Sequence, residues 1–186
     1  MPALPVYLDR DGVINRNCAD YIRSLDEWTP LEGSLEAMAA LSAAGHPLVV
    51  VTNQSAVARG YTTVAEVEAI HRELRRRAGL AGAVVSGIYY CPHHPDDGCG
   101  CRKPATGLIE RARRELRLPP GGWMVGDASS DVELGRNAGL RTVLVMTGRG
   151  ADQLARMRAG GGPLPDDVCR DLAEAASLIL EDQRKQ

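Results

Sequence analysis

Apolar residues follow two different spacings along this chain, and the two alternate. Short runs rich in Val, Leu and Ile predict buried strands over 6–8, 47–52, 84–90, 123–127 and 141–146. Segments whose apolar residues recur every three or four positions predict helices over 33–44, 64–77, 106–117, 130–138, 151–158 and 171–181, with a short edge strand near Val168. Strands that alternate with helices predict a doubly wound α/β fold on a parallel sheet.

Two segments interrupt this alternation. Residues 13–32 show no regular spacing and carry Tyr21 and Trp28, so we expect a hairpin-like flap over the mouth of a site. Residues 91–101 form a second irregular loop, which contains Pro and Gly. The intervals between the predicted strands are too short for a large cap domain. We therefore predict a single capless domain over 1–186 and a small, polar substrate.

Composition narrows the possible functions. The chain has 44% hydrophobic and 25% charged residues, as globular proteins do, and its net charge of −2 argues against a general nucleic-acid or anionic-membrane surface. No run approaches the ~18 apolar residues of a membrane span, and the N-terminal apolar run is too short for a signal peptide. Five cysteines, an odd number with three in 91–101, favour a reducing compartment. We expect a cytoplasmic monomer.

Polar side chains gather where the predicted strands end. Asp9 and Asp11 follow the first strand, Thr52 ends the second, and Asp127 ends the fourth. In a doubly wound sheet these carboxyl ends meet at the edge where ligands bind. Each residue alone would suit a solvated turn or a helix cap. Their occurrence in this order favours one shared site.

Two carboxylates separated by one residue suit phosphoryl transfer. Asp9 can attack phosphorus as a nucleophile and form an acyl-phosphate. Asp11 can protonate the leaving oxygen and later accept a proton from the attacking water. Because two anions would repel a phosphate, a cation is required. We predict Mg²⁺, with Asp127 as a further ligand.

Further residues complete the predicted site. The hydroxyl of Thr52 and the amide of Asn53 can hold phosphoryl oxygens, and Lys103 can neutralise the charge that develops on them. Lys103 is conspicuous because the other basic residues, apart from Lys185, are arginines. Asp131 is expected to orient Lys103 or the waters of the metal.

The 91–101 loop carries a second set of ligands. Its thiolates and imidazoles come in two closely spaced pairs and suit a closed tetrahedral Zn²⁺ with a structural role, bound by Cys91, His93, Cys99 and Cys101. His94 is an alternative to His93. Because Pro and Gly make the loop too irregular to fold by itself, zinc would stiffen it. Cys18 and Cys169 have no predicted role.

The motifs together resemble two nested families. Asp9 with Asp11, Thr52, Lys103, and Asp127 with Asp131 resemble the four motifs of the haloacid dehalogenase-like phosphatase superfamily over about residues 6–146. Residues 51–55 with 58–60, and 87–95 with 99–104, resemble the D-glycero-D-manno-heptose-1,7-bisphosphate 7-phosphatase family. This resemblance implies a Mg²⁺-dependent cytoplasmic enzyme with a structural zinc. Such an enzyme removes the 7-phosphate in the nucleotide-activated heptose pathway that feeds lipopolysaccharide or surface glycans.

The resemblance also implies individual roles. It makes Asp9 the nucleophile, Asp11 the acid and base, and Thr52 and Lys103 the stabilisers of the phosphoryl group. The implied magnesium ligands are Asp9, the carbonyl of Asp11, and Asp127.

The sequence also suggests substrate contacts. Arg102 is a recognition residue whose guanidinium fork suits a distal 1-phosphate, and Arg59 is a weaker candidate for the same task. Ala128 stands where family members often carry a Lys, which leaves the anomer preference open. The family pattern favours His93 over His94 as the zinc ligand. Further residues expected to line the substrate are Asn17, Asp20, Asn53, Gln54 and Ser55.

Three other functions stay open from the sequence alone. Histidinol-phosphate phosphatases share the four motifs and a similar zinc loop, and Asp96 and Asp97 could bind the amine of that substrate. Arg102 and Arg59 argue against this alternative. The alternative of another class is a zinc-stabilised, non-catalytic binding module, or a nucleic-acid binder that uses the loop. The intact acid pair argues against the first, and the net charge argues against the second.

Overall fold

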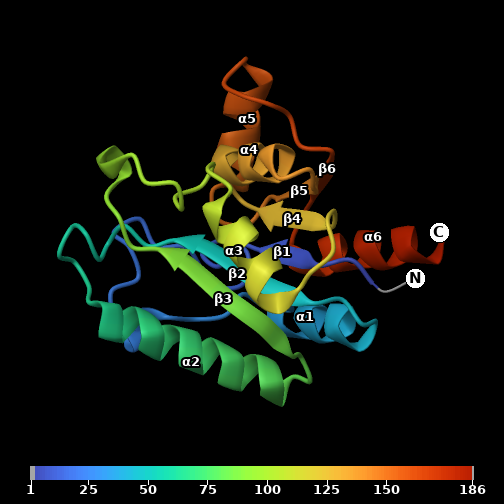
Figure 1. Ribbon diagram of the computed structural model, residues 1–186, viewed down its shortest axis with the longest axis horizontal. Helices are drawn as coiled ribbons and strands as arrows, with labels where there is room; N and C mark the ends of the chain where they lie inside the picture. The colour runs from blue at the N-terminus through green and yellow to red at the C-terminus, as the bar shows by residue number, and fades with distance from the viewer. Residues whose placement is uncertain (1–2, 186) are drawn as a thin grey trace.

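The computed structural model describes residues 3–185, and its centre is a six-stranded parallel sheet (Figure 1). The strands are β1 (Val6–Leu8), β2 (Leu48–Asn53), β3 (Val85–Cys91), β4 (Trp123–Gly126), β5 (Arg141–Val145) and β6 (Asp167–Cys169). Their spatial order is β3-β2-β1-β4-β5-β6, and every neighbouring pair is parallel. The order reverses at β1, which confirms the predicted doubly wound sheet.

Helices cover both faces of the sheet. They are α1 (Ser34–Ala43), α2 (Val64–Leu80), α3 (Gly107–Leu116), α4 (Ser129–Asn137), α5 (Gly150–Arg158) and α6 (Leu172–Arg184). Helices α1, α2 and α6 lie on one face, and α3, α4 and α5 lie on the other (Figure 1). Each predicted helix is present, although α2 runs three residues beyond its predicted end. None of the described helices combines the length and apolar character needed to cross a membrane.

The side chains of β1 show how the core fixes the site. Val6 and Leu8 pack into the cluster beneath α1 and α6, whereas Tyr7 points to the opposite face, beneath α3 and α4. All three are fully buried. Beyond Leu8 the ladder continues for one more bond, from the Asp9 N–H to the Val125 carbonyl at 2.9 Å. The backbone of Asp9 is therefore fixed by the central strands.

The predicted flap is paired only at its base. The Arg16 N–H donates to the Thr29 carbonyl and the Leu31 N–H to the Ile14 carbonyl, both at 2.9 Å. Beyond these bonds the flap is irregular apart from the 3₁₀ turn η1 (Leu25–Glu27). Buried Ile22 and Trp28 anchor it on the core. The flap and α1 fill the interval between β1 and β2, so no large cap domain stands there.

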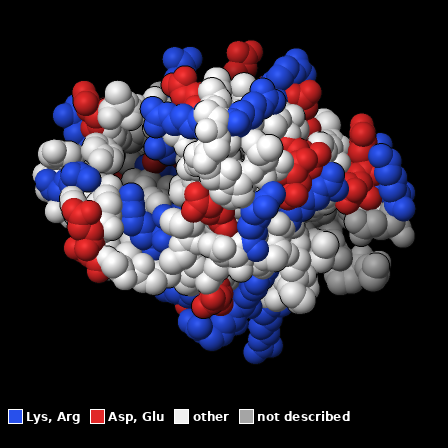
Figure 2. All heavy atoms as spheres, turned by 90° about the horizontal axis from the view of Figure 1, so that it is seen from above, with Lys and Arg blue, Asp and Glu red and all other residues white. Residues whose placement is uncertain are grey.

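The strands end at one side of the molecule. In Figure 1 their carboxyl ends lie at the left, near the 91–101 loop, and the labelled chain ends lie at the right. The face in Figure 2, seen from above, carries acidic and basic side chains interspersed. This distribution agrees with the net charge of −2.

Candidate active site and ligand clusters

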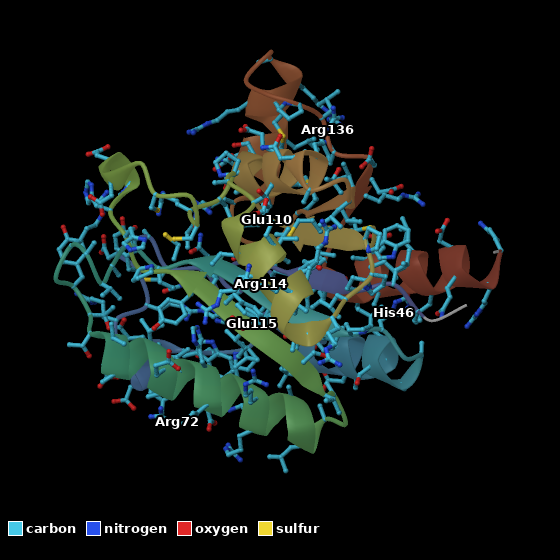
Figure 3. All side chains as sticks on the ribbon, viewed as in Figure 1. His46, Arg72, Glu110, Arg114, Glu115 and Arg136 are labelled. Carbon is cyan, nitrogen blue, oxygen red and sulfur yellow. The ribbon has the colours of Figure 1, made fainter. Side chains whose placement is uncertain are left out.

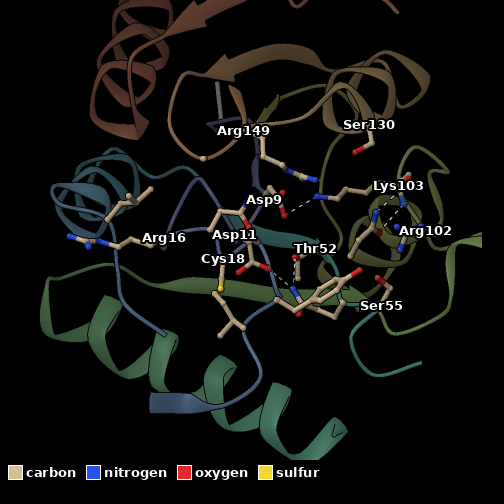
Figure 4. A pocket seen from close by; sticks show the side chains of 18 residues that line it. Asp9, Asp11, Arg16, Cys18, Thr52, Ser55, Arg102, Lys103, Ser130 and Arg149 are labelled. Carbon is tan, nitrogen blue, oxygen red and sulfur yellow. Dashed lines mark hydrogen bonds and ion pairs between the residues drawn. The ribbon is translucent and has the colours of Figure 1, made fainter. Parts of the chain in front are cut away.

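A cavity of about 950 Å³ opens at the carboxyl ends of the central strands (Figure 4). Most of the residues predicted for chemistry or substrate line it, namely Asp9, Asp11, Asn17, Thr52, Asn53, Gln54, Ser55, Arg102 and Lys103. Two predicted substrate residues lie outside this lining. Asp20 and Arg59 are exposed on the surface.

A buried lysine joins two carboxylates at the floor of the cavity. Lys103 Nζ lies 2.8 Å from Asp9 Oδ1 and 2.7 Å from Asp131 Oδ1, and it donates to the Val51 carbonyl at 3.1 Å. Burial by itself would lower the pKa of Lys103, but Asp131 and Asp9 raise it. Burial also raises the pKa of Asp9 to about 6, and the charge of Lys103 opposes that shift. Of the two tasks predicted for Asp131, orienting Lys103 is the one visible here.

Three carboxylates meet closely enough to hold one cation. One oxygen each of Asp9, Asp127 and Asp131 lies within 4.8 Å of the others, and all three residues are buried. Asp127 accepts from the Arg149 N–H at 2.8 Å, and its other oxygen lies 3.5 Å from the Arg149 guanidinium. Hard carboxylate oxygens in a concave site are the donors that Mg²⁺ prefers. The residues present therefore fit the predicted magnesium.

Two glycines make room for Asp127. Gly12 and Gly148 have φ values of 86° and 59°, and a Cβ atom on either would overlap the Asp127 carboxylate. Gly12 follows the acid pair directly in the sequence, whereas Gly148 reaches that carboxylate only because folding brings the loop after β5 to it.

Asp11 is held by a fully buried arginine. The Arg10 guanidinium contacts both Asp11 oxygens at 3.0 Å, and Asn15 Nδ2 and Gln54 Nε2 each donate to the carboxylate at 2.9 Å. Burial by itself would raise the pKa of Asp11, but Arg10 and these hydrogen bonds lower it. The sequence had suggested only a spacer between the two aspartates at Arg10.

Two residues predicted to contact substrate have their side chains committed elsewhere. Asn53 brackets the main chain of Lys103, donating to its carbonyl at 3.3 Å and accepting from its N–H at 3.1 Å. Gln54 donates to Thr52 Oγ1 at 3.0 Å as well as to Asp11. Both line the cavity, but these contacts make them supports for Lys103, Thr52 and Asp11.

The sulfur ligands converge as predicted. Cys99 Sγ lies 3.5 Å from Cys91 Sγ and 3.6 Å from Cys101 Sγ, and His93 Nδ1 lies 3.5 Å from Cys91 Sγ and 3.2 Å from Cys101 Sγ. A tetrahedron with metal bonds of about 2.0–2.3 Å has edges of roughly 3.3–3.8 Å. The four atoms therefore fit Zn²⁺.

The alternative zinc ligand lies outside this cluster. His94 Nδ1 accepts from the Asp96 N–H at 3.4 Å and caps the 3₁₀ turn η2 (Pro95–Asp97). Asp97 accepts from the His94 N–H at 2.8 Å. Asp96 and Asp97 do not line the cavity, so the acidic rim that histidinol phosphate would need is not formed by them.

Several lining residues had no individual role predicted from the sequence, although the flap that carries three of them was expected over the site. They come from the flap, the start of α4 and the loop after β5, and are Arg16, Cys18, Tyr21, Ser130 and Arg149. Tyr21 has a φ of 67°, and its ring centre lies 5.6 Å from that of Tyr61. No local motif marks these positions, because only folding brings their segments to the cavity.

Known proteins resemble this chain over nearly its whole length. A D-glycero-beta-D-manno-heptose-1,7-bisphosphate 7-phosphatase of Pseudomonas aeruginosa is 46% identical over 94% of this chain and 96% of its own. The enzyme of that name from Bordetella bronchiseptica is 42% identical over 95% and 98%. A family model described as HAD-hydrolase-like matches residues 100–175.

A solved structure agrees with these relatives. The crystal structure of the D,D-heptose 1,7-bisphosphate phosphatase from B. bronchiseptica, complexed with magnesium and phosphate, superposes with a TM-score of 0.89. It is 41% identical and covers 96% of this chain and 99% of its own. With the site geometry, these similarities confirm the family suggested by the motifs. The chain belongs to the D-glycero-D-manno-heptose-1,7-bisphosphate 7-phosphatase family of haloacid dehalogenase-like phosphatases.

Proposed function

We propose that this protein removes the 7-phosphate of D-glycero-β-D-manno-heptose 1,7-bisphosphate. The observation that carries the proposal is the placement of Asp9 at the end of β1, 2.8 Å from Lys103, in a chain 46% identical to a phosphatase with that substrate in its name. The names of these relatives specify the β anomer, which the sequence left open. A monomeric state and a cytoplasmic location remain predictions.

The proposed reaction runs in two displacements. An Asp9 carboxylate oxygen attacks the 7-phosphorus, the bond from phosphorus to the sugar oxygen breaks, and Asp11 donates a proton to that oxygen. Water then attacks the aspartyl-phosphate while Asp11 accepts its proton. Inorganic phosphate leaves, and Asp9 is regenerated as a carboxylate.

The protonation of Asp11 needs the substrate. Arg10 and the surrounding donors hold Asp11 as an anion in the free protein, which suits the second displacement. A phosphate bound beside it is a like charge, and a like charge raises the proton affinity of a carboxylate. Substrate binding therefore favours the acid form required in the first displacement.

Two metals fit this proposal. Asp9, the Asp11 carbonyl and Asp127 would hold Mg²⁺, which when bound supplies positive charge against the phosphoryl oxygens. Lys103 and the Thr52 hydroxyl stabilise the same oxygens from the chain itself. The cluster of Cys91, His93, Cys99 and Cys101 would hold a structural Zn²⁺.

Arg102 is the proposed recognition residue for the distal phosphate. It lines the cavity beside Lys103, and its Nη1 is buried without a hydrogen-bond partner among the described residues. A phosphate oxygen would satisfy that donor. Histidinol phosphate carries an amine and no second phosphate, so this guanidinium would disfavour it. Arg149, which pairs with Asp127, adds a second guanidinium to the cavity lining, and Asp127 directly precedes Ala128, the position where a family Lys is missing.

The proposal is tested by substrate competition. We expect kcat/KM, measured as Mg²⁺-dependent phosphate release, to be at least tenfold higher for the β bisphosphate than for the α anomer or histidinol phosphate. Preference for the α anomer would change the assigned pathway. Preference for histidinol phosphate would contradict the role of Arg102 and leave the Asp9 mechanism in place.

A further inference from the structure

Arg10 is a buried cation that the reaction described above does not use. It stands between the two aspartates at the end of β1, its side chain is fully buried, and it does not line the cavity. Its Nε and Nη2 contact the two oxygens of Asp11 at 3.0 Å, and Nη2 also donates to Gln54 Oε1 at 3.1 Å. The remaining nitrogen, Nη1, lies 3.2 Å from His71 Nε2. The guanidinium therefore has partners at all three nitrogens.

The stability of the fold is a poor explanation for this arrangement. Replacing a buried ion pair with apolar residues is often neutral or stabilising, because the desolvation cost offsets the attraction. Orientation is a better explanation. The Asp11 side chain lies beyond the last ladder bond of β1, so the backbone pairing does not fix its rotamer. The planar guanidinium of Arg10, which contacts both Asp11 oxygens, does fix that rotamer.

His71 in turn fixes Arg10 from a distant part of the chain. It lies on α2, is 4% exposed, and its ring meets the edge of Tyr90 with centroids 5.2 Å apart. Burial first, and then the charge of Arg10, lower the pKa of His71 to about 3, so the ring is neutral. A neutral ring can present Nε2 as an acceptor to the guanidinium.

We propose that Arg10 is a positioning residue that aims the Asp11 carboxyl at the leaving oxygen, and that His71 on α2 anchors Arg10 for this task. The inference rests on the proposed role of Asp11 as general acid. It predicts that loss of Arg10 or His71 impairs protonation of the leaving group more than it impairs attack by Asp9.

Two substrates separate these effects. An alkyl phosphate such as the heptose bisphosphate releases a strongly basic alkoxide that needs a proton, whereas p-nitrophenyl phosphate releases a weakly basic phenolate that does not. The quantity to compare is kcat/KM, because it covers the steps through departure of the leaving group. General damage to the site or fold lowers both values together.

The decisive variant is Arg10→Met, which keeps the unbranched apolar stem of the side chain and removes the guanidinium. We expect kcat/KM for the bisphosphate to fall on the order of 100-fold, and that for p-nitrophenyl phosphate to fall less than about 5-fold. Arg10→Lys keeps the positive charge but cannot contact both Asp11 oxygens in the bidentate geometry. It should also lose more kcat/KM with the bisphosphate than with p-nitrophenyl phosphate, by a smaller factor than Arg10→Met.

The anchor is tested with a matched pair of histidines. His71→Phe removes the acceptor and keeps an aromatic ring against Tyr90. We expect kcat/KM for the bisphosphate to fall on the order of tenfold more than kcat/KM for p-nitrophenyl phosphate. His46 is equally buried and hydrogen-bonded, to the Leu4 carbonyl and to Gln183, but lies toward the opposite end of the sheet (Figure 3). His46→Phe should lower the melting temperature without changing the substrate ratio.

Equal losses for both substrates in Arg10→Met and Arg10→Lys would overturn the inference, as would a smaller loss for the alkyl ester. If Arg10→Met does not fold, Arg10→Lys and His71→Phe still report the ratio. Failure of the proposed function is distinguishable. It would appear in the wild-type protein as a lack of preference for the bisphosphate, while the ratio between an alkyl and an aryl phosphate could still be compared among variants.

Discussion

The two ligand clusters of this protein are built in opposite ways. The Cys/His cluster comes from one continuous segment of eleven residues, 91–101, which projects beyond the end of β3. The acidic cluster of Asp9, Asp127 and Asp131 is assembled from the end of β1, the end of β4 and the start of α4. The first depends on local spacing, and the second depends on the whole sheet.

The two clusters also differ in burial and in the contacts that hold their ligands. The acidic cluster is buried and contains its own cation, since Lys103 pairs with Asp9 and Asp131. The Cys/His cluster is partly exposed, since Cys91 is buried at the end of β3, Cys99 and Cys101 are half-buried against the core, and His93 is exposed. We therefore expect the acidic site to keep its shape without metal, and the loop to need its metal. Three changes test this contrast.

The largest expected effect is on activity at the acidic cluster. Asp9→Asn removes the proposed nucleophile and should lower kcat by more than about 10³-fold. The melting temperature should stay equal or rise, because a neutral amide replaces a carboxylate that burial disfavours. Asp26→Asn, on the exposed η1 turn, is the matched control and should change neither quantity. A large loss of stability in Asp9→Asn would contradict the expectation that burial disfavours the charged form of Asp9.

The next effect is on the order of the loop. Cys99→Ser should abolish stoichiometric zinc, measured by elemental analysis, and increase amide exchange over 91–103. Because Arg102 and Lys103 follow Cys101 directly, kcat/KM should fall on the order of 100-fold through misplacement. Cys169→Ala, a buried thiol of β6 outside the cluster, should keep its zinc. Unchanged amide exchange over 91–103 in the zinc-free variant would show that the loop is ordered without zinc.

The smallest effect concerns Arg102, where the two regions adjoin. Arg102→Gln should raise KM for the bisphosphate on the order of 10-fold and leave kcat/KM for p-nitrophenyl phosphate unchanged, since that substrate has no distal phosphate. Arg72→Gln, an exposed change on α2 (Figure 3), is the control. A larger effect from Arg59→Gln would instead identify Arg59 as the phosphate contact, despite its position outside the cavity lining.

The order of residues was enough to predict the features that depend on neighbours along the chain. Apolar runs and helical spacing gave the order of strands and helices, and the strand ends located Asp9, Thr52 and Asp127. The spacing of the loop located three cysteines and two alternative histidines as zinc ligands, and the short intervals between strands argued against a large cap domain. Each of these depends on backbone periodicity or local reach, which the order of residues encodes directly.

The folded structure, by contrast, was needed to show where individual side chains point. It places His93 within the zinc cluster and His94 outside it. The side chains of Asn53 and Gln54 bind neighbouring protein residues. Asp20 and Arg59 lie outside the cavity lining. Folding also joined Arg10 to His71 across 61 residues and carried Arg149 to Asp127. These contacts depend on how distant segments pack across the sheet, and neither periodicity nor spacing along the chain encodes that packing.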